Sequence, residues 1–380
     1  MDISQLLCDS PESLPNGSTA DDTAANVLFQ EIGRGSCGTV FQHNNTTAAL
    51  KVANKEDGEL WNEYLMLARV QYGFKNINLS HNLRAPDIAY FVSDGDSEWW
   101  DSHETYFPPR LRNMKPQVLY IERILPIPAP IRQRLIDRHC PEDMKANARD
   151  DPLNEACLLR VHLGKRRPES GLDQLRSFFL RNFTIYQGEV GEDIPGGQRY
   201  DVRNVECLMG QALAAMHWKV RIDADGVKFV LGMDGKSRWH HLVPSQIAAL
   251  PENISTWPLT QSTPEPMMRL WLFDSNRCKD MPKNGKGVQQ AVQVFCHSDS
   301  HFPRPSRKAD SNNELWHKFV NAYMETANSI LKDEESISVK ALPGIFIICC
   351  TYWITNDENM NSEESKKPLG KAQSAADEVY

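Results

Sequence analysis

The chain contains no long hydrophobic run. Its longest apolar stretch, residues 345–354, is far shorter than the about 20 residues that a helix needs to span a bilayer. The first residues, Met-Asp-Ile-Ser, also lack the basic start and apolar segment of a signal peptide. These absences predict an intracellular protein, cytoplasmic or nuclear, that does not enter a membrane.

The chain also lacks paired cysteines. It has nine cysteines, an odd number, and no C-x-x-C pair, so free buried thiols are the expected state. A zinc site needs clustered Cys and His ligands in tetrahedral geometry, and neither Cys296-His297 nor His240-His241 supplies enough of them. No zinc site is therefore expected.

Basic residues are fewer than acidic ones. There are 42 Lys and Arg against 50 Asp and Glu, which gives a net charge of −8. General binding of nucleic acid or of anionic membranes depends on a basic surface, so neither is an expected partner. With 380 residues, 41% of them hydrophobic, the chain is long enough for two lobes or domains.

A glycine-rich stretch near the start of the chain is followed by a short apolar strand that carries Lys51. The glycines of this stretch, EIGRGSCGTVF, are Gly33, Gly35 and Gly38, in the spacing G-x-G-x-x-G-x-V. A turn of this kind brings the backbone close to phosphates, and Val40 and Phe41 restart a strand that can cover an adenine ring. The spacing alone also occurs in Rossmann folds and hairpins. Because no helical pattern follows the glycines and Lys51 lies in a strand, the kinase-type interpretation is favoured.

Residues 59–70 predict a helix, because apolar residues recur at helical spacing without Gly or Pro. Glu63 lies in the middle of this helix. A buried lysine beside phosphates needs a carboxylate to hold its position and charge, which makes Glu63 the first choice as partner of Lys51. Glu59 and Glu56 are alternatives, and a solvated helix face is the other interpretation.

Two further strands are predicted at 88–92 and 117–123, with an insertion at 93–116 between them. The insertion is long for a hairpin and contains Trp99, Trp100 and Tyr106, which either cover the sheet or meet a partner. Three prolines in residues 124–130 exclude a helix or a central strand and mark the end of the first lobe.

The second part of the chain is mainly helical by pattern. Helices are predicted at 131–137, 172–183, 202–218 and 313–331, and residues 288–295 fit either a helix or a buried strand. The predicted domains are a disordered tail at 1–26, a β-rich lobe at 27–125, a helical lobe at 126–344, and a divergent, largely disordered tail at 345–380.

Three aspartates stand where phosphate chemistry would need them. Asp223 and Asp225 follow the long helix at 202–218, in a loop before a short strand, and are candidates for a base that accepts a hydroxyl proton. Asp274 ends the apolar strand 267–273 and is placed to hold Mg²⁺ against phosphates. A turn or a helix cap is the simpler role for an aspartate at a strand end, and the upstream motif shifts the balance.

The order of these elements resembles the protein kinase fold. More closely, the segments ALAAMHW (212–218), IDAD (222–225), FVLG (229–232), LWLFD (270–274) and FPRP (302–305) resemble a fungal family of uncharacterised kinase-like proteins, often labelled zinc-finger proteins. The resemblance implies an α+β, two-lobed fold with a β-rich N-lobe and a mainly helical C-lobe. It also implies an ATP site with Mg²⁺, in which the backbone from Tyr120 to Arg123, including Tyr120 and Glu122, reads the adenine edge.

The departures from the kinase pattern concern catalysis. If Asp223 is the base, an asparagine is expected about five residues later, and Lys228 and Phe229 stand there. The Asp-Phe-Gly triplet is replaced by Asp274-Ser-Asn, so binding is better supported than turnover. Three roles stay open: an atypical phosphotransferase with an unknown acceptor, a pseudokinase that works as an interaction module, or an accessory protein of fungal secondary-metabolite biosynthesis.

Overall fold

The structure, a computed structural model, describes residues 29–364 apart from 44–45, 56, 168–177, 182, 191–193, 195–203, 236, 241–242, 253, 256–258, 263–266, 298–300 and 307–310. The predicted tail at 1–26, the alternative carboxylate Glu56 and most of the helix predicted at 172–183 therefore lie outside the described residues. The end of that helix prediction falls on a strand instead, β8.

Short apolar runs, buried on both faces in β3 and β5, build the first sheet, whose order is β1-β2-β3-β6-β5. Its strands are β1 (Gln30–Arg34), β2 (Gly38–Gln42), β3 (Ala48–Ala53), β5 (Ile88–Val92) and β6 (Val118–Glu122). All pairings are antiparallel, and the strands predicted at 88–92 and 117–123 are confirmed as β5 and β6. Val40 of β2 lies opposite Lys51 of β3 in the register, so both belong to the same face of the sheet.

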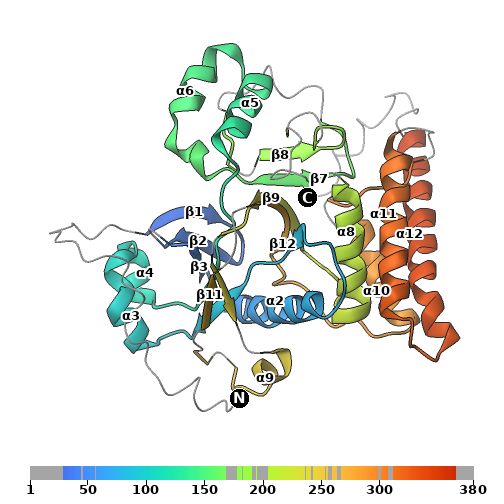
Figure 1. Ribbon diagram of the computed structural model, residues 1–380, viewed down its shortest axis with the longest axis horizontal. Helices are drawn as coiled ribbons and strands as arrows, with labels where there is room; N and C mark the ends of the chain where they lie inside the picture. Colours follow the sequence, from blue (N-terminus) through green and yellow to red (C-terminus); the bar gives the residue numbers. More distant parts are fainter. Residues whose placement is uncertain are drawn as a thin grey trace, which may run out of the picture.

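Helices cover both faces of this sheet. On one side packs α2 (Glu59–Lys75; Figure 1), which buries Leu60, Tyr64 and Leu67 as the sequence predicts. On the other side lie α3 (Ser97–His103), η1 (Glu104–Tyr106) and α4 (Pro109–Met114), which form the insertion at 93–116. Of the two interpretations of the insertion, a cover for the sheet is confirmed, because Trp99 and Trp100 are buried in a cluster with strand residues.

The second sheet has the order β4-β12-β9-β7-β8. Its strands are β4 (Leu83–Arg84), β7 (Leu159–His162), β8 (Phe183–Tyr186), β9 (Lys228–Met233) and β12 (Met268–Phe273). β9 and β12 pair antiparallel, and this register places Lys228, the first residue of β9, opposite Phe273, the last residue of β12. A bridge between Leu125 and Met233 joins the segment after β6 to this sheet.

Helices and a two-stranded antiparallel sheet complete the described part of the chain. The helices are α5 (Ala129–His139), η2 (Glu142–Met144), α6 (Lys145–Asp150), η3 (Pro152–Ala156), α8 (Val205–Ala214), the π-helical turn η4 (Ala215–Val220), α9 (Pro244–Ala248), α10 (Gly285–His297), α11 (Ser311–Ile330) and α12 (Ile337–Glu364). The third sheet pairs β10 (Ser237–His240) antiparallel with β11 (Leu259–Ser262). Together the described elements form a mixed α+β fold, and α10 settles the choice between helix and strand at 288–295 in favour of a helix.

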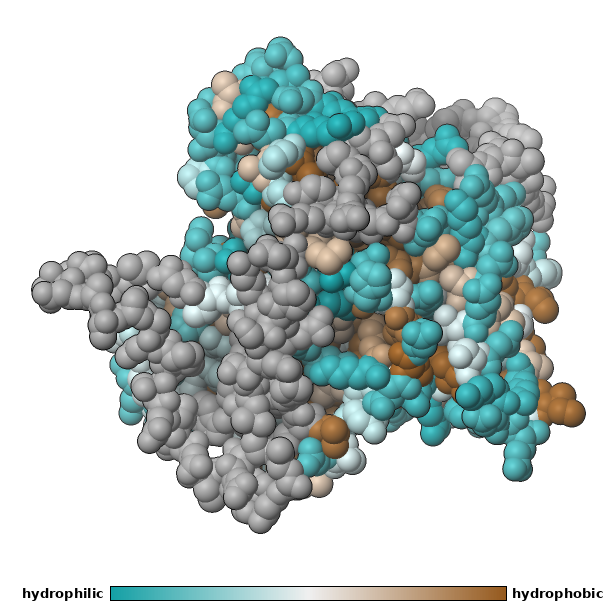
Figure 2. Space-filling view, viewed as in Figure 1, coloured by the Kyte–Doolittle hydropathy of each residue, from teal (hydrophilic) through white to brown (hydrophobic). Residues whose placement is uncertain are grey.

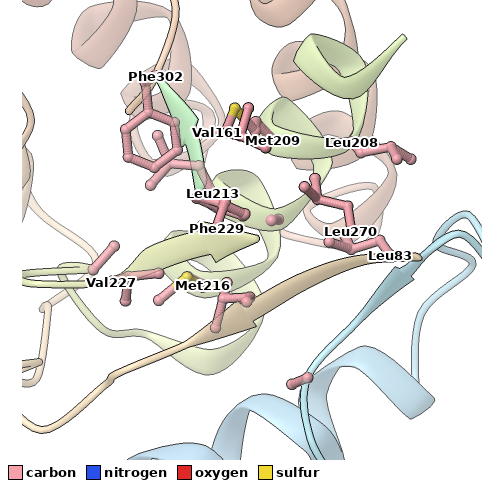
Figure 3. Packing of buried hydrophobic residues seen from close by; sticks show 14 of the residues in the cluster. Leu83, Val161, Leu208, Met209, Leu213, Met216, Val227, Phe229, Leu270 and Phe302 are labelled. Atoms are coloured by element: carbon pink, nitrogen blue, oxygen red, sulfur yellow. The ribbon is translucent and has the colours of Figure 1, made fainter. Parts of the chain in front are cut away.

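The main core lies where α8 and its π-helical turn meet the second sheet. Figure 3 shows Leu213 and Met216 beside Val227, which precedes β9, and Phe229, which lies in β9. On the far side of α8 lies α11, and the two helices approach so closely that only a glycine fits at position 210. A Cβ there would lie 2.4 Å from the carbonyl oxygen of Phe319.

Helix α12 crosses the domain boundary predicted at residue 345. It packs against α10 and α11 through Phe346, Cys350 and Ile354, all buried, so the apolar run at 345–354 belongs to the packed fold. Hydrophobic residues also reach the surface on the side of Figure 2 where these helices lie, and α12 contributes exposed Ile348 and Tyr352. By length and composition alone, residues 337–356, with a mean hydropathy of 1.7, would also suffice to cross a membrane.

Candidate functional site

Lys51 is the centre of a buried cluster of charges contributed by three distant parts of the chain. Its Nζ donates to Glu63 Oε2 of α2 at 2.5 Å and to Asp274 Oδ1, directly after β12, at 2.9 Å. The side chains of Lys51 and Glu63 are only 8% and 5% exposed. The predicted pairing of Lys51 with Glu63 is present, and the alternative Glu59 instead accepts a hydrogen bond from Asn276 at 3.0 Å.

Lys51 and Asp274 stabilise each other's charge, whereas burial raises the pKa of Glu63 despite the attraction of Lys51. Burial lowers the pKa of Lys51, but the attraction of Glu63 and Asp274 outweighs it and the net pKa is raised. Burial raises the pKa of Asp274, but Lys51 and Lys228 outweigh it and hold the value at about 2. At neutral pH, therefore, Lys51 carries its positive charge and Asp274 its negative charge.

The glycine turn closes directly over Lys51. The peptide N–H of Gly35 donates to the carbonyl of Gly38 at 2.9 Å, and Asn54 Nδ2 donates to the carbonyl of Gly35 at 2.8 Å. A Cβ at position 38 would lie 2.8 Å from the Val52 carbonyl oxygen and 3.0 Å from Lys51 Cγ. Gly38 is therefore needed for the close approach, whereas the nearest atom to a Cβ at Gly35 is 3.8 Å away.

The two residues predicted to cover an adenine ring lie on different faces. Phe41 is buried on the face that packs against the insertion, with its ring 5.4 Å from that of Phe107, so it points away from Lys51. Val40 belongs to the face of Lys51 and packs 3.6 Å from the position that a Cβ on Gly33 would take. Of these two residues, Val40 lies on the face of Lys51 and Phe41 does not.

A second lysine meets Asp274 from the opposite side. Lys228 Nζ donates to Asp274 Oδ2, while Lys51 Nζ donates to Oδ1, so each carboxylate oxygen accepts from one lysine. Asp274 also has a left-handed backbone, with φ of 68°, which is unusual for a residue other than glycine. The strand register accounts for this contact, because Lys228 starts β9 directly across from the residue before Asp274.

Asp223, the first candidate base, is held on all sides by hydrogen bonds. Its Oδ1 accepts from the peptide N–H of Asp225 at 3.2 Å and of Lys279 at 3.0 Å. Its Oδ2 accepts from Gln290 Nε2 at 2.7 Å, and the residue is only 2% exposed. This carboxylate ties the loop after η4 to the segment before α10.

Asp225, the second candidate, pairs with Arg277. Arg277 Nη2 lies 3.1 Å from both carboxylate oxygens of Asp225, and its side chain is 62% exposed. The three predicted aspartates nonetheless share one space. Asp223, Asp225 and Asp274 line a cavity of about 520 Å³, together with Ser36 of the glycine turn and Lys228.

The residues predicted to read an adenine edge have partners inside the protein. Tyr120 Oη lies 2.5 Å from His43 Nδ1, and Glu122 Oε2 accepts from Arg84 Nη2 at 2.8 Å. The peptide N–H of Glu122 donates to the Asp87 carbonyl at 2.7 Å. The Tyr120 side chain and the Glu122 peptide donor are thus engaged within the protein, and the Glu122 side chain is paired with Arg84 of β4. Adenine contact at these positions stays a prediction.

Sequence reasoning brought Lys51, Glu63, Asp223, Asp225 and Asp274 together, but it missed what surrounds them. It treated Lys228 only as the absence of an asparagine and gave no role to Gln290 or Arg277. Lys228 lies at the start of β9. Once the pairing of β9 with β12 is known, this position indicates that its side chain can reach Asp274. No comparable sequence signal marks Gln290.

Comparison with known proteins gives one partial match. The model of a family described as zinc finger protein matches residues 270–335, from β12 to the segment after α11. No curated protein and no solved structure matches the chain. Within the described residues, no three His, Cys, Asp or Glu side chains come together as a metal site requires, and the eight cysteines described there are free thiols. The prediction that the chain has no zinc site stays a prediction.

Proposed function

We propose that the chain is a kinase-like protein that binds ATP through Lys51 and Lys228 and works as a binding or regulatory module without turnover. The observation that carries this proposal is the position of the Lys51 ammonium. It lies under a glycine turn and bridges carboxylates that are 12 and 223 residues away in the sequence. A charge held this firmly inside a protein is well suited to receive an anionic phosphate.

The surroundings of Lys51 support a small-molecule site. The adjoining cavity of about 520 Å³ is within the range of ligand pockets, which is roughly 300–1,000 Å³. Ser36, Lys228 and Arg277 line it, so the glycine turn and two cations face the same space. The order of the strands and of α2 agrees with the two-lobed arrangement that the kinase resemblance implies.

The aspartates favour binding over turnover. A general base must reach the proton that it abstracts, but the oxygens of Asp223 accept from two peptide N–H groups and from Gln290. Asp225 is paired with Arg277 through both of its oxygens. With both candidate bases engaged, a pseudokinase is the better supported of the two kinase-like roles.

Calorimetric titration of the full chain with ATP tests the proposal. Wild-type protein should bind, and Lys51→Met should weaken binding by about tenfold or more, because a charge-assisted hydrogen bond to phosphate is lost. Lys75→Met, at the exposed end of α2, is the matched control and should bind as the wild type does. Circular dichroism checks that each variant is folded, and Glu63→Gln, which should also weaken binding, removes the partner of Lys51 instead of the lysine.

Two results would contradict the proposal. Failure of the wild-type protein to bind ATP, or equal binding by wild type and folded Lys51→Met, would exclude a nucleotide site at Lys51. Release of phosphate from ATP by the wild type, abolished in Asp274→Ala, would instead show turnover and favour a phosphotransferase. The acceptor, the cellular location and an accessory role in fungal secondary metabolism stay predictions.

A further inference from the structure

Kinase-like nucleotide sites are expected to hold Mg²⁺, and the residues present here do not fit that ion. Mg²⁺ prefers about six oxygen ligands at roughly 2.0–2.1 Å in octahedral geometry. Asp274 is the carboxylate in the expected place, and each of its oxygens already accepts from a lysine. The second expected ligand, an asparagine about five residues after Asp223, is replaced by Lys228, which has no oxygen to offer.

The two other carboxylates of this cavity do not supply the missing ligands, since both oxygens of Asp225 already pair with Arg277. Asp223 is occupied by the peptide N–H groups of Asp225 and Lys279 and by Gln290. In the part of the chain that the structure describes, no group of three His, Cys, Asp or Glu side chains is placed to hold a metal. A divalent ion beside Asp274 would therefore have to displace Lys228 and would still lack protein ligands.

Lys228 itself has the properties that a counterion for phosphate needs. Its side chain is 29% exposed and lines the cavity, so its ammonium reaches both Asp274 and the space where a ligand would lie. The backbone of β9 anchors it beside Asp274 through the pairing with β12. Lys51 approaches the same carboxylate from the other side at 2.9 Å, so the two ammonium groups flank one anionic residue.

We propose that the Lys228 ammonium takes the place of the divalent cation, so that this site binds nucleotide phosphates free of metal. The inference rests on the proposed function and specifies the form of its ligand. Magnesium-bound ATP has part of its phosphate charge neutralised already, and its ion would be repelled by Lys228. Metal-free nucleotide keeps its full charge for Lys51 and Lys228.

The first test compares ATP binding by wild-type protein in EDTA and in excess Mg²⁺, by calorimetry at constant ionic strength. Affinity in EDTA should equal or exceed the affinity in Mg²⁺. Weaker binding in EDTA than in Mg²⁺ would overturn the inference while leaving the proposed nucleotide site intact. Binding in neither buffer would overturn the proposed function, and this inference with it.

The second test restores the ligand that a kinase-type site would have. Lys228→Asn replaces the ammonium by an amide oxygen, so binding in EDTA should fall by about tenfold or more and should improve when Mg²⁺ is added. Lys228→Met, which supplies neither charge nor ligand, should bind weakly in both buffers. The control is Lys332→Asn. The Lys332 side chain is 71% exposed, so this variant should keep wild-type affinities. Wild-type affinity of folded Lys228→Asn in EDTA would overturn the inference.

Discussion

Gln290 of α10 donates a hydrogen bond to Asp223 Oδ2 at 2.7 Å across 67 residues of sequence. The same carboxylate accepts two peptide N–H groups at its other oxygen. Asp223 therefore fastens the loop after η4 to the segment that leads into α10. Its role is therefore structural, because all three of its hydrogen bonds are made within the protein.

Asp223→Ala should destabilise the fold by about 3 kcal/mol, because it leaves buried peptide donors without an acceptor. Asp225→Ala should cost no more than about 1 kcal/mol, since its partner Arg277 is largely exposed. Urea unfolding followed by tryptophan fluorescence measures both. Equal losses in the two variants would contradict a special structural role for Asp223.

Gly38→Ala should destabilise the protein by about 1–3 kcal/mol, because the new methyl group would meet the Val52 carbonyl and Lys51 Cγ. It should also shift the Lys51 side chain and weaken ATP binding. Gly35→Ala, with its nearest neighbour 3.8 Å away, is the matched control and should change stability little. Thermal unfolding and calorimetry provide the two measurements. Wild-type stability of Gly38→Ala would contradict this prediction, because it would mean that the turn can move to accept the methyl group.

Gly210→Ala and Gly344→Ala should have opposite effects on stability. At Gly210 the methyl group would lie 2.4 Å from the Phe319 carbonyl, so α8 and α11 must separate and stability should fall by about 2 kcal/mol or more. At Gly344, inside α12, an added Cβ would meet no packing neighbour within 4 Å. Alanine should therefore stabilise the helix by about 0.5–1 kcal/mol. Urea unfolding of both variants tests this, and a common sign would refute it.

His217 should make the protein less stable as pH falls below about 6.5. Burial lowers the pKa of His217 to about 3, so the unfolded chain gains a proton at a pH where the folded protein does not. The group's contribution is constant above about 6.5 and is lost between there and about pH 3, at up to about 1.4 kcal/mol per pH unit. Its hydrogen bonds agree with a neutral ring: Tyr323 Oη accepts from Trp218 Nε1 at 2.8 Å and can give its own proton to His217 Nδ1, 3.1 Å away.

His217→Gln should remove this part of the pH dependence. Between pH 6 and pH 5 its unfolding free energy should fall by about 1 kcal/mol less than that of the wild type. His81→Gln, at an exposed position, is the control and should keep the wild-type slope. Urea unfolding at each pH provides the comparison, and identical slopes for all three proteins would show that His217 is not responsible.

The parts of the fold that depend on local pattern were predictable from the sequence. The helix that carries Glu63 has an uninterrupted helical spacing, and β3 has an apolar run around Lys51, so their types were clear. Their pairing at 2.5 Å required only that the helix pack on the sheet. Asp274 was likewise predictable as the residue that follows a buried strand.

The charge partners of Asp274 and Asp223 were not predictable, because they depend on tertiary register. Lys228 reaches Asp274 only because β9 and β12 pair so that Lys228 lies across from Phe273. Gln290 reaches Asp223 only because of where α10 is docked. Adjacent Val40 and Phe41 of β2 must point to opposite faces, but the sequence did not show which face lies beside Lys51. Phe41 was therefore predicted to cover a ligand, whereas it packs against Phe107.

The packing of α12 matters for anyone who shortens this protein for expression. Phe346 contacts Phe295, His217 and Tyr323, with ring centroids 5.7, 4.9 and 5.3 Å apart. A recombinant chain that stops at residue 344, where the sequence suggests a boundary, would expose these rings to solvent and should aggregate. A chain that keeps α12 leaves these rings covered and should stay soluble where the shortened chain does not.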